Sequence, residues 1–368
     1  MKFFCNFEAI KQQNGTGMSE TGRKEKRSRK VRLEDIAQRC SVSLSTASRA
    51  LAGEKGVRPE IRARIMSMAK TLNYVVPASI AGRKVILAAS GAAMLDYVRN
   101  QFTFHVLEGL KARAQILGVE IVTQPIADPP HDISALEEAL ADEEVAGFLF
   151  LTLDDEDILS LTRGFDKPVV LVNGDDPLMR LSSVTPCNRS AARMGTEHLL
   201  SLGHQQILFL MRRGRRTIER RFEGWRDALA LRGITDIGDL VVEVEDWLPE
   251  LAAEAIGARI AARGLDFTAV LTAGDSLAVG AVDGLHRCGY KVPGDVSVIG
   301  MDDLPQAAFH NPPLTTIHIP MREIGGVALD LLLDSVDGMM TPPQRIELAC
   351  QIVERQSTAP VARSAAGH

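Results

Sequence analysis

A run of hydroxyl and guanidinium side chains near the N-terminus has the chemistry of a surface that contacts DNA. The sequence SVSLSTASRAL carries Leu44, Ser45, Thr46, Ser48 and Arg49. Hydroxyl groups bind phosphate oxygens, a guanidinium reads the edge of a guanine, and a leucine contacts thymine methyl groups. If the run is a helix, we expect these side chains to form an outward face that fits a major groove.

The apolar residues around this run predict three short helices. They recur at helical intervals: Leu33, Ile36, Ala37 and Cys40 in the first, Ala47, Ala50 and Leu51 in the second, and Ile61, Ile65, Met68 and Leu72 in the third. Ser43 is placed to cap the second helix. We therefore expect an all-α helix-turn-helix domain over residues 31–74. Two simpler interpretations stay open, because a small Arg-rich bundle can bind a protein and Arg49 can be a solvated surface charge.

The charge of the chain is divided unequally between its ends. Residues 1–84 carry 18 Lys and Arg against 7 Asp and Glu, or +11, and residues 85–368 carry 24 against 40, or −16, which together make the net charge of −5. A basic head on an acidic body is typical of a protein that binds nucleic acid through one segment. We expect residues 1–30 to be a disordered basic extension and residues 359–368 a disordered tail.

Several classes of function are excluded by what the sequence lacks. It has no apolar run long enough to span a bilayer and no export signal, so we expect a cytoplasmic protein with no membrane partner. The five cysteines are scattered, which argues against a disulfide framework or structural zinc. No catalytic motif is present, so we expect no enzyme, cofactor or metal. The acidic run 154–157 reads as a solvated face, and His198 and His204 as capping or packing residues.

Residues 85–358 alternate apolar strand-like runs with helical segments, in two successive series. Repeated βα units predict parallel sheets with helices on both faces, and two series predict two lobes. Ligands of such sheets bind beyond the carboxyl ends of the strands, so a cleft between the lobes is the expected site.

Three segments resemble the LacI/GalR family of bacterial transcriptional regulators. They are LEDIAQRCSVSLSTASRALAG in the head, TEHLLSLGHQQILFL in the body, and LTAGDSLAVGAVDGLHRCGYKVPGDVSVIGMDDLPQAAFHNPPLTTI, with ERQST near the end. The resemblance implies a two-lobed, periplasmic-binding-protein-like (type I) body. It also implies three crossovers between the lobes, which we expect near residues 183–188, 303–308 and 316–320. Ser41 departs from the family pattern, which has glycine in this turn.

The same resemblance assigns DNA contacts in the head and linker. Leu44, Ser45 and Arg49 would read bases, whereas the phosphate backbone would be contacted by Ser43, Thr46, Ser48 and Asn73. Ser43 can equally be a simple helix cap. Residues 75–84 would form a hinge that inserts Ile80 into the minor groove. A plain flexible linker is the alternative, because the interval from Tyr74 to Ile80 is shorter than in relatives.

The resemblance also implies a set of effector-binding residues: Ser90, Phe102, Asn173, Arg221, Trp247 and Asp275. Carboxylate, amide and guanidinium groups with a flat aromatic face suit a sugar or sugar derivative. Asp275 has the strongest rationale, because a carboxylate just past a buried strand is costly without a partner. Arg221 can instead be a surface charge, and Trp247 and Phe102 can be core residues. Cys187 stands where relatives usually have aspartate, which favours an atypical effector.

Together these features predict a homodimeric repressor whose affinity for a pseudo-palindromic operator is controlled by a small-molecule effector. A sugar-transport receptor would instead need an export signal and no DNA-binding head. An α/β enzyme tethered to nucleic acid would need a catalytic constellation. The sequence shows neither pattern.

Overall fold

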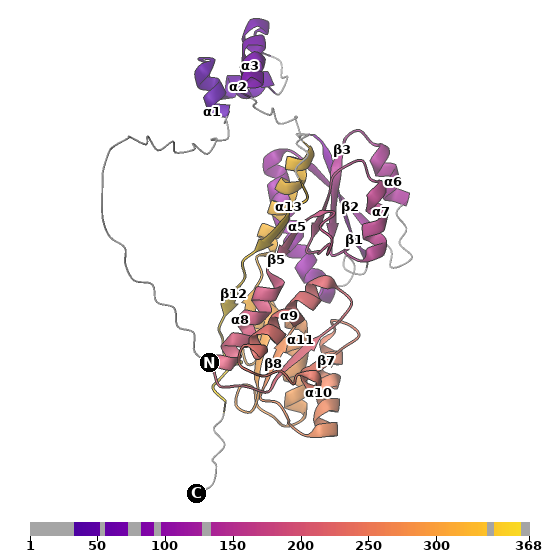
Figure 1. Ribbon diagram of the computed structural model, residues 1–368, viewed down its shortest axis with the longest axis vertical. Coiled ribbons are helices and arrows are strands. Elements are labelled where there is room, and N and C mark those ends of the chain that lie inside the picture. Colours follow the sequence, from indigo (N-terminus) through magenta and orange to yellow (C-terminus); the bar gives the residue numbers. More distant parts are fainter. Residues whose placement is uncertain are drawn as a thin grey trace, which may run out of the picture. The chain divides into compact units, whose positions relative to one another are not determined.

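The computed structural model describes residues 33–51, 56–72, 82–91, 97–126, 134–336 and 342–361 (Figure 1). The chain divides into two compact units, Met1–Val76 and Pro77–His368. The expected extension 1–30 lies outside the described residues, as do Asn73 and Ile80.

The first unit is a bundle of three helices: α1 (Leu33–Arg39), α2 (Leu44–Leu51) and α3 (Pro59–Thr71). Ile36, Ala47 and Ile65 are fully buried at its centre, as the helical spacing of apolar residues predicts. Ser41 has a φ of 50° in the turn between α1 and α2. A left-handed conformation costs energy for any residue with a Cβ, so a serine strains this turn.

The second unit contains two six-stranded sheets, one in each lobe (Figure 1). In the first lobe the order is β11-β5-β4-β3-β1-β2, with β1 (Lys84–Ser90), β2 (Glu120–Ile126), β3 (Val145–Leu151), β4 (Val169–Val172), β5 (Ser182–Pro186) and β11 (Arg345–Leu348). In the second lobe the order is β12-β10-β9-β8-β6-β7, with β6 (Ile207–Met211), β7 (Val241–Glu243), β8 (Ala269–Thr272), β9 (Ser297–Asp302), β10 (Thr315–His318) and β12 (Gln351–Val353). Among these described strands, all pairings are parallel except that of β10 with β12. The predicted fold class is confirmed.

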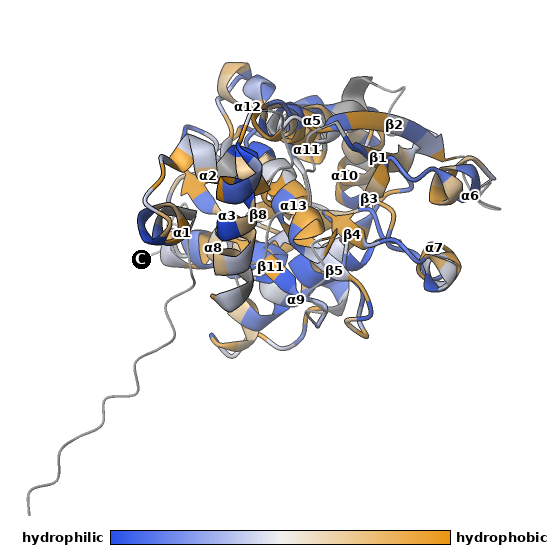
Figure 2. Ribbon diagram, turned by 90° about the horizontal axis from the view of Figure 1, so that it is seen from above, coloured by the Kyte–Doolittle hydropathy of each residue, from blue (hydrophilic) through white to orange (hydrophobic). Residues whose placement is uncertain are grey.

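Helices cover the sheets. They are α5 (Tyr97–Leu117), α6 (Ser134–Ala141), α7 (Glu156–Leu161), α8 (Asn188–Ser201), α9 (Arg216–Ala230), α10 (Pro249–Arg263), α11 (Asp275–Arg287), α12 (Pro305–Phe309) and α13 (Met321–Val336), with short 3₁₀ turns at Thr162–Gly164 and Gly238–Leu240. Every residue of β3 and β6 is buried, as expected for parallel strands with helices on both faces. Figure 2 shows β3 and β4 in the orange of hydrophobic residues. Close helix packing also needs Gly224, where a Cβ would collide with the carbonyl of Arg189 on α8.

The chain crosses between the lobes at three described places. It passes from β5 to α8 at Cys187, from β10 to α13 at residues 319–320, and from β11 to β12 at residues 349–350. The first and second crossings lie close to the expected positions. The crossover expected at residues 303–308 is wrong, because β9 and β10 pair within the second sheet and α12 lies between them in the chain.

The ordered chain continues past residue 358, where we expected a disordered tail to begin. His204, which is buried, donates from Nε2 to the carbonyl of Ala359 at 2.9 Å, and Val361 donates to the carbonyl of Leu202 at 3.0 Å. Burial lowers the pKa of His204, in keeping with a neutral packing residue. In the described part of the chain, no helix combines the length and the apolar character that crossing a membrane requires.

Candidate DNA-binding surface and interlobe site

The predicted polar face of helix α2 is largely exposed to solvent. Its buried side is formed by Ala47 and Ala50, while Ser45 and Arg49 are exposed and Thr46 is half-buried. Leu44 is 47 % exposed, which is unusual for a large apolar side chain and leaves it accessible to a partner. For Ser48 only the backbone position on α2 is described.

Ser43 is the cap of α2. Its Oγ accepts a hydrogen bond from the Thr46 amide at 3.1 Å and lies 2.7 Å from the Thr46 hydroxyl and 3.0 Å from that of Ser45. Helix capping of this kind satisfies an amide that has no partner within the helix. Among the described residues, the hydrogen bond found for Arg49 runs from Nε to the Ser45 carbonyl at 3.4 Å, which leaves most of its guanidinium donors without a partner there.

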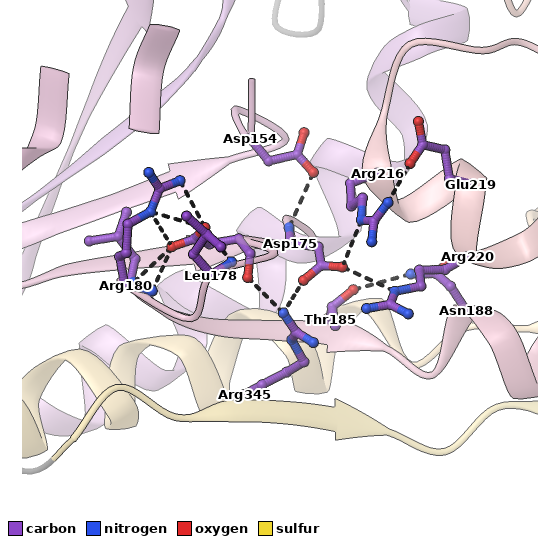
Figure 3. A network of polar contacts seen from close by, with 12 residues as sticks. Asp154, Asp175, Leu178, Arg180, Thr185, Asn188, Arg216, Glu219, Arg220 and Arg345 are labelled. Atoms are coloured by element: carbon purple, nitrogen blue, oxygen red, sulfur yellow. Dashed lines mark hydrogen bonds and ion pairs between the residues drawn. The ribbon is translucent and has the colours of Figure 1, made fainter. Parts of the chain in front are cut away.

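Asp154 and Asp175, in the loops that follow β3 and β4, pair with arginines of the second lobe, and Figure 3 labels both carboxylates with Arg216, Arg220 and Arg345. We call this group the interlobe ion-pair network: Asp154, Asp175 and Arg345 from the first lobe, and Arg215, Arg216 and Arg220 from the second. Arg215 lies 3.4 Å from Asp154 and also donates to the carbonyl of Asn173. Arg220 lies 3.2 Å from Asp175, and Arg216 lies 3.7 Å from it.

This network corrects one expectation about the acidic run 154–157. The Asp154 side chain is only 5 % exposed and faces Arg215, so it is not part of a solvated face. Asp155 instead caps α7, accepting from the Ile158 amide at 3.0 Å. Glu156 and Asp157 are exposed as expected. A buried carboxylate needs a compensating charge, and here the second lobe supplies it.

Arg221 lies at the centre of a second polar group, on α9. It is 4 % exposed, so the alternative of a surface charge is wrong. Its Nε donates to Asn188 Oδ1 at 2.8 Å, its Nη1 donates to the carbonyl of Ala273, and Nη1 lies 3.6 Å from Asp302 Oδ1. Burial lowers the pKa of Arg221, whereas Asp302 opposes that shift. Burial raises the pKa of Asp302 to about 7, even though Arg221 favours its ionised form.

Asp275, the first residue of α11, has its partners within the protein. Its Oδ1 accepts from the Thr316 hydroxyl at 2.6 Å, and its Oδ2 accepts from the Leu304 amide at 2.8 Å. Burial raises the pKa of Asp275 to about 6, although both hydrogen bonds oppose the shift. These bonds hold the end of β9 and the loop after it, where Asp302 and Asp303 have φ values of 124° and 57°. Asp275 therefore positions the loop that carries Asp302.

Trp247 lies beside the same loop. A Cβ built on Gly274 would be 3.3 Å from Asp302 Oδ2 and 3.4 Å from the Trp247 ring, so both side chains approach this glycine. Trp247 is half-buried, with part of its ring packed on the core. Of the predicted effector residues, the structure thus places Arg221, Trp247 and Asp275 around one loop of the second lobe.

The other three predicted effector residues come from the first lobe. Asn173 follows β4, next to Arg215 of the second lobe. Ser90 ends β1 and is half-buried. Phe102 lies on α5, packed against the core, which favours its alternative as a packing residue. The described hydrogen bonds and ion pairs do not connect Ser90 or Phe102 to Arg221.

Several buried polar atoms in and around the interlobe ion-pair network have no hydrogen-bond partner among the described residues: Asn173 Oδ1, Asp175 Oδ1 and Arg345 Nε in the first lobe, and Arg216 Nε and Thr217 Oγ1 in the second. Asn173 and Thr217 are only 5 % and 2 % exposed. Groups of this kind are rare in native proteins and commonly point to a water, an ion or a ligand. Asn173 belongs to the first lobe and Thr217 to the second, on α9.

The sequence analysis did not identify Asp302 or Thr217 as candidate site residues. Asp302 follows the apolar run VSVIGM of β9, just as Asn173 follows VVLV of β4, and that shared position was a usable signal. Thr217 gave no such signal, because it lies within an Arg-rich run whose direction of burial only the fold determines.

A surface hollow of about 680 Å³ lies elsewhere on the second lobe. Its lining includes Gln206, Asp239, Arg259 and Asp266. Gln206 and Asp266 precede β6 and β8, so the hollow lies at the amino ends of the strands. Ligand sites of open parallel sheets form at the opposite ends, so this hollow is not a candidate effector site. No cluster of His, Cys, Asp and Glu able to hold a metal ion occurs among the described residues.

Comparison with known proteins agrees with the fold and its head. The family model "Bacterial regulatory proteins, lacI family" matches residues 32–76, and "Periplasmic binding protein-like domain" matches residues 196–358. The chain is 31% identical over 347 residues to the HTH-type transcriptional regulator MalR of Streptomyces coelicolor, covering 89% of this chain and 97% of that protein. The chain belongs to the LacI family. It is a DNA-binding transcriptional regulator with a periplasmic-binding-protein-like body, and it is not an enzyme.

Other LacI-family relatives extend over the same length. The lactose operon repressor of Escherichia coli is 27% identical over 336 residues, covering 89% of this chain and 91% of that protein. The solved complex of the transcriptional regulator CelR with cellobiose is 27% identical, covers 89% of this chain and 99% of its own, and superposes with a TM-score of 0.67. The lac repressor dimer, solved with operator and the anti-inducer ONPF, is 26% identical, covers 90% and 100%, and has a TM-score of 0.65.

Proposed function

We propose that this LacI-family regulator is a cytoplasmic repressor whose operator affinity is set by a sugar-like effector bound between its lobes. The observation that carries this proposal is the pair of buried, unsatisfied oxygens, Asn173 Oδ1 and Thr217 Oγ1, contributed by different lobes next to the interlobe ion-pair network. A ligand that reaches both oxygens, donating to Asn173 Oδ1 and exchanging a hydrogen bond with Thr217 Oγ1, would satisfy them and bridge the lobes.

The chemistry around this position suits a polyol. The Asn173 and Asp302 oxygens accept hydrogen bonds from hydroxyl groups, and the Arg221 guanidinium donates to ring or hydroxyl oxygens. Trp247 offers a flat apolar face of the kind that packs against a sugar ring. Cellobiose in the related CelR complex supports a carbohydrate as the class of effector.

The head supplies the operator contacts in this proposal. Leu44, Ser45 and Arg49 read base edges in the major groove, while Ser43, Thr46 and Ser48 contact phosphates. Asn73 adds a phosphate contact, and Ile80 of the hinge at residues 75–84 enters the minor groove. The proposed domains are therefore a head at 31–74, this hinge, and a body at 85–358. The +11 charge of residues 1–84 supports the arrangement.

A second copy of the chain completes the proposed regulator. Large apolar side chains are exposed in both lobes: Phe104 and Ile116 on α5 of the first lobe, and Phe309, 89% exposed, on α12 of the second. Apolar groups of this size and exposure are typical of an interface between copies. A homodimer places two heads on the two halves of a pseudo-palindromic operator, as the dimeric state of the related lac repressor supports.

In this proposal the three described crossovers couple effector binding to operator binding. Effector binding changes the angle between the lobes and rearranges the interlobe ion-pair network, and the first lobes of the dimer carry that change to the heads. An effector changes operator affinity only if it binds the two arrangements of the lobes with different affinities. It therefore releases the operator if it prefers the arrangement with low operator affinity, and strengthens binding if it prefers the other.

The test uses the full chain and the DNA upstream of its own coding region. Specific gel shifts at moderate salt are expected, together with a rise in melting temperature on adding one or more sugars, sugar acids or oligosaccharides from a screen. The sugar that raises the melting temperature is expected to alter the gel shift. Absence of any specific shift, with and without every sugar, would refute a DNA-binding repressor.

Two variants test the remaining parts. Replacing Phe309 with Asp should convert the dimer to monomer in analytical ultracentrifugation, whereas replacing the exposed Leu231 with Asp serves as the matched control. Thr217→Val should abolish the thermal shift produced by the sugar without lowering the melting temperature of the free protein. An unchanged sugar response in Thr217→Val would remove the interlobe site from the proposal.

A further inference from the structure

Two cysteines lie on neighbouring segments that pass between the lobes. Cys187 links β5 of the first lobe to α8 of the second, and Cys350 links β11 to β12. Strands β5 and β11 are parallel neighbours with Pro186 opposite Leu348, so both segments leave the first sheet side by side. The cysteines therefore occupy two of the three crossovers found in the described residues.

Contacts with one carbonyl bring the two cysteines together. The carbonyl of Leu348 accepts from the Cys187 amide at 2.9 Å and from the Cys350 thiol at 3.8 Å. Both thiols are free. Cys350 is buried, and burial raises its pKa to about 11, although Arg221 opposes that shift. The amide and thiol of Cys187 lie close enough to influence the same pKa.

We propose that Cys187 and Cys350 are a redox-sensitive pair, which a peroxide converts to an intramolecular disulfide that ties two crossovers together. A bond between them would close a long loop, because they are far apart in sequence. A disulfide requires two backbone segments that lie close together, and these cysteines follow adjacent parallel strands. Disulfides in cytoplasmic proteins are mostly transient and redox-sensing, which is the use that we assign to this pair.

The two thiols have different roles in the reaction. Cys187 is partly accessible, whereas Cys350 is buried and stays protonated at neutral pH. The Cys187 thiolate attacks one oxygen of hydrogen peroxide, forming Cys187 sulfenic acid and releasing hydroxide. The Cys350 sulfur then attacks the Cys187 sulfur, forming the disulfide and releasing water. Overall, two thiols lose two electrons and two protons, and one peroxide becomes two waters.

The disulfide would restrain the crossovers, which are the segments that couple effector binding to operator binding in the proposed mechanism. Reorientation of the lobes requires the crossovers to change their backbone angles independently, and a covalent bond between two of them opposes this. Arg221 lies near the Cys350 thiol, so the bond would form beside the interlobe site. This regulatory consequence rests on the proposed function, whereas formation of the disulfide does not.

The chemical test is peptide mapping of the full chain after treatment with hydrogen peroxide. We expect a non-reduced peptide pair joining Cys187 to Cys350, which disappears on adding dithiothreitol. Cys187→Ser and Cys350→Ser should both lack it. Cys288→Ser should retain it, because Cys288 is exposed at the end of α11 and distant in sequence from both crossovers. Mapping of the unsubstituted chain keeps the test valid if a variant fails to fold.

Oxidation should also raise the melting temperature of the body by about 5–10 °C, because the bond closes a long loop. Peroxide products confined to Cys288, disulfides between separate chains, or overoxidation of Cys187 without a bond to Cys350 would overturn the proposal.

A gel-shift arm separates this inference from the proposed function. Oxidised and reduced protein are titrated with the same upstream DNA, with and without the sugar found by thermal shift. We expect the sugar to change operator affinity at least about 10-fold less in the oxidised protein. An equal sugar response in both forms would refute the regulatory role. Disulfide formation in a protein that binds no DNA would instead refute the proposed repressor and leave the redox pair standing.

Discussion

The hydroxyl of Thr316 tests the role that the structure gives to Asp275. It donates to Asp275 Oδ1 at 2.6 Å, and both residues are completely buried. Thr316→Val removes this donor, together with the acceptor of a weak 3.4 Å contact from the Asp303 amide, and leaves the side-chain volume almost unchanged. A hydrogen bond to a charged group contributes about 1.5–3 kcal/mol, and one to a neutral group about 1 kcal/mol.

The expected loss of stability therefore depends on pH. Burial raises the pKa of Asp275 to about 6 in the folded protein, above its ordinary value of 3.8. Its carboxyl is mostly protonated at pH 5 and ionised at pH 8. Thr316→Val removes a stabiliser of the ionised form, so its extra cost appears as pH rises through about 6. We expect a loss of about 2–3 kcal/mol at pH 8 and about 1 kcal/mol at pH 5.

Thermal unfolding at both pH values measures this difference. A loss of 2–3 kcal/mol should lower the melting temperature by about 4–9 °C. Thr162→Val is the matched control, because Thr162 is also buried but donates to a neutral acceptor, the carbonyl of Leu159, at 2.9 Å. Its cost should not change with pH. Equal destabilisation by Thr316→Val at pH 5 and pH 8 would refute a hydroxyl bonded to an ionising carboxylate.

Three further predictions concern the head and the loop after β9. Ser41→Gly should stabilise the helical head by about 0.5–1 kcal/mol because it relieves the positive φ of 50°, seen as slower hydrogen exchange in α1 and α2. Arg49→Ala should cost about 1–3 kcal/mol of operator affinity at a single base position, and gel shifts that weaken uniformly with all sequences would show a phosphate contact instead. Asp302 has a raised pKa of about 7, so the folded protein retains its proton longer than the unfolded chain and loses stability as pH rises from about 4 to 7. Between pH 5 and pH 8 the Asp302→Asn variant should accordingly lose about 2–3 kcal/mol less free energy of unfolding than the unsubstituted chain, seen as a smaller fall in melting temperature. An identical fall in both proteins would contradict a buried, titrating Asp302.

Much of the architecture was predictable from the order of residues alone. The apolar spacing in residues 33–72 specified three helices, because a helix buries the same face every three to four residues. The two series of apolar runs specified parallel sheets, because strands covered on both faces cannot alternate with polar residues. Asn173 was assigned by resemblance to the LacI/GalR family, and its place directly after the apolar run VVLV agrees with a position at the carboxyl end of a strand.

The partners of those polar side chains were decided by tertiary structure. Asp154 looks like part of an exposed acidic run, but packing of the second lobe supplies Arg215 to it. Asp275 was expected to await a ligand, yet Thr316 and the Leu304 amide already satisfy it. Cys187 and Cys350 are far apart in sequence but share the carbonyl of Leu348. Local periodicity reports which face of an element is buried. It carries no information about which distant residue lies opposite, and that residue determines whether a buried charge is paired, free to bind or able to react.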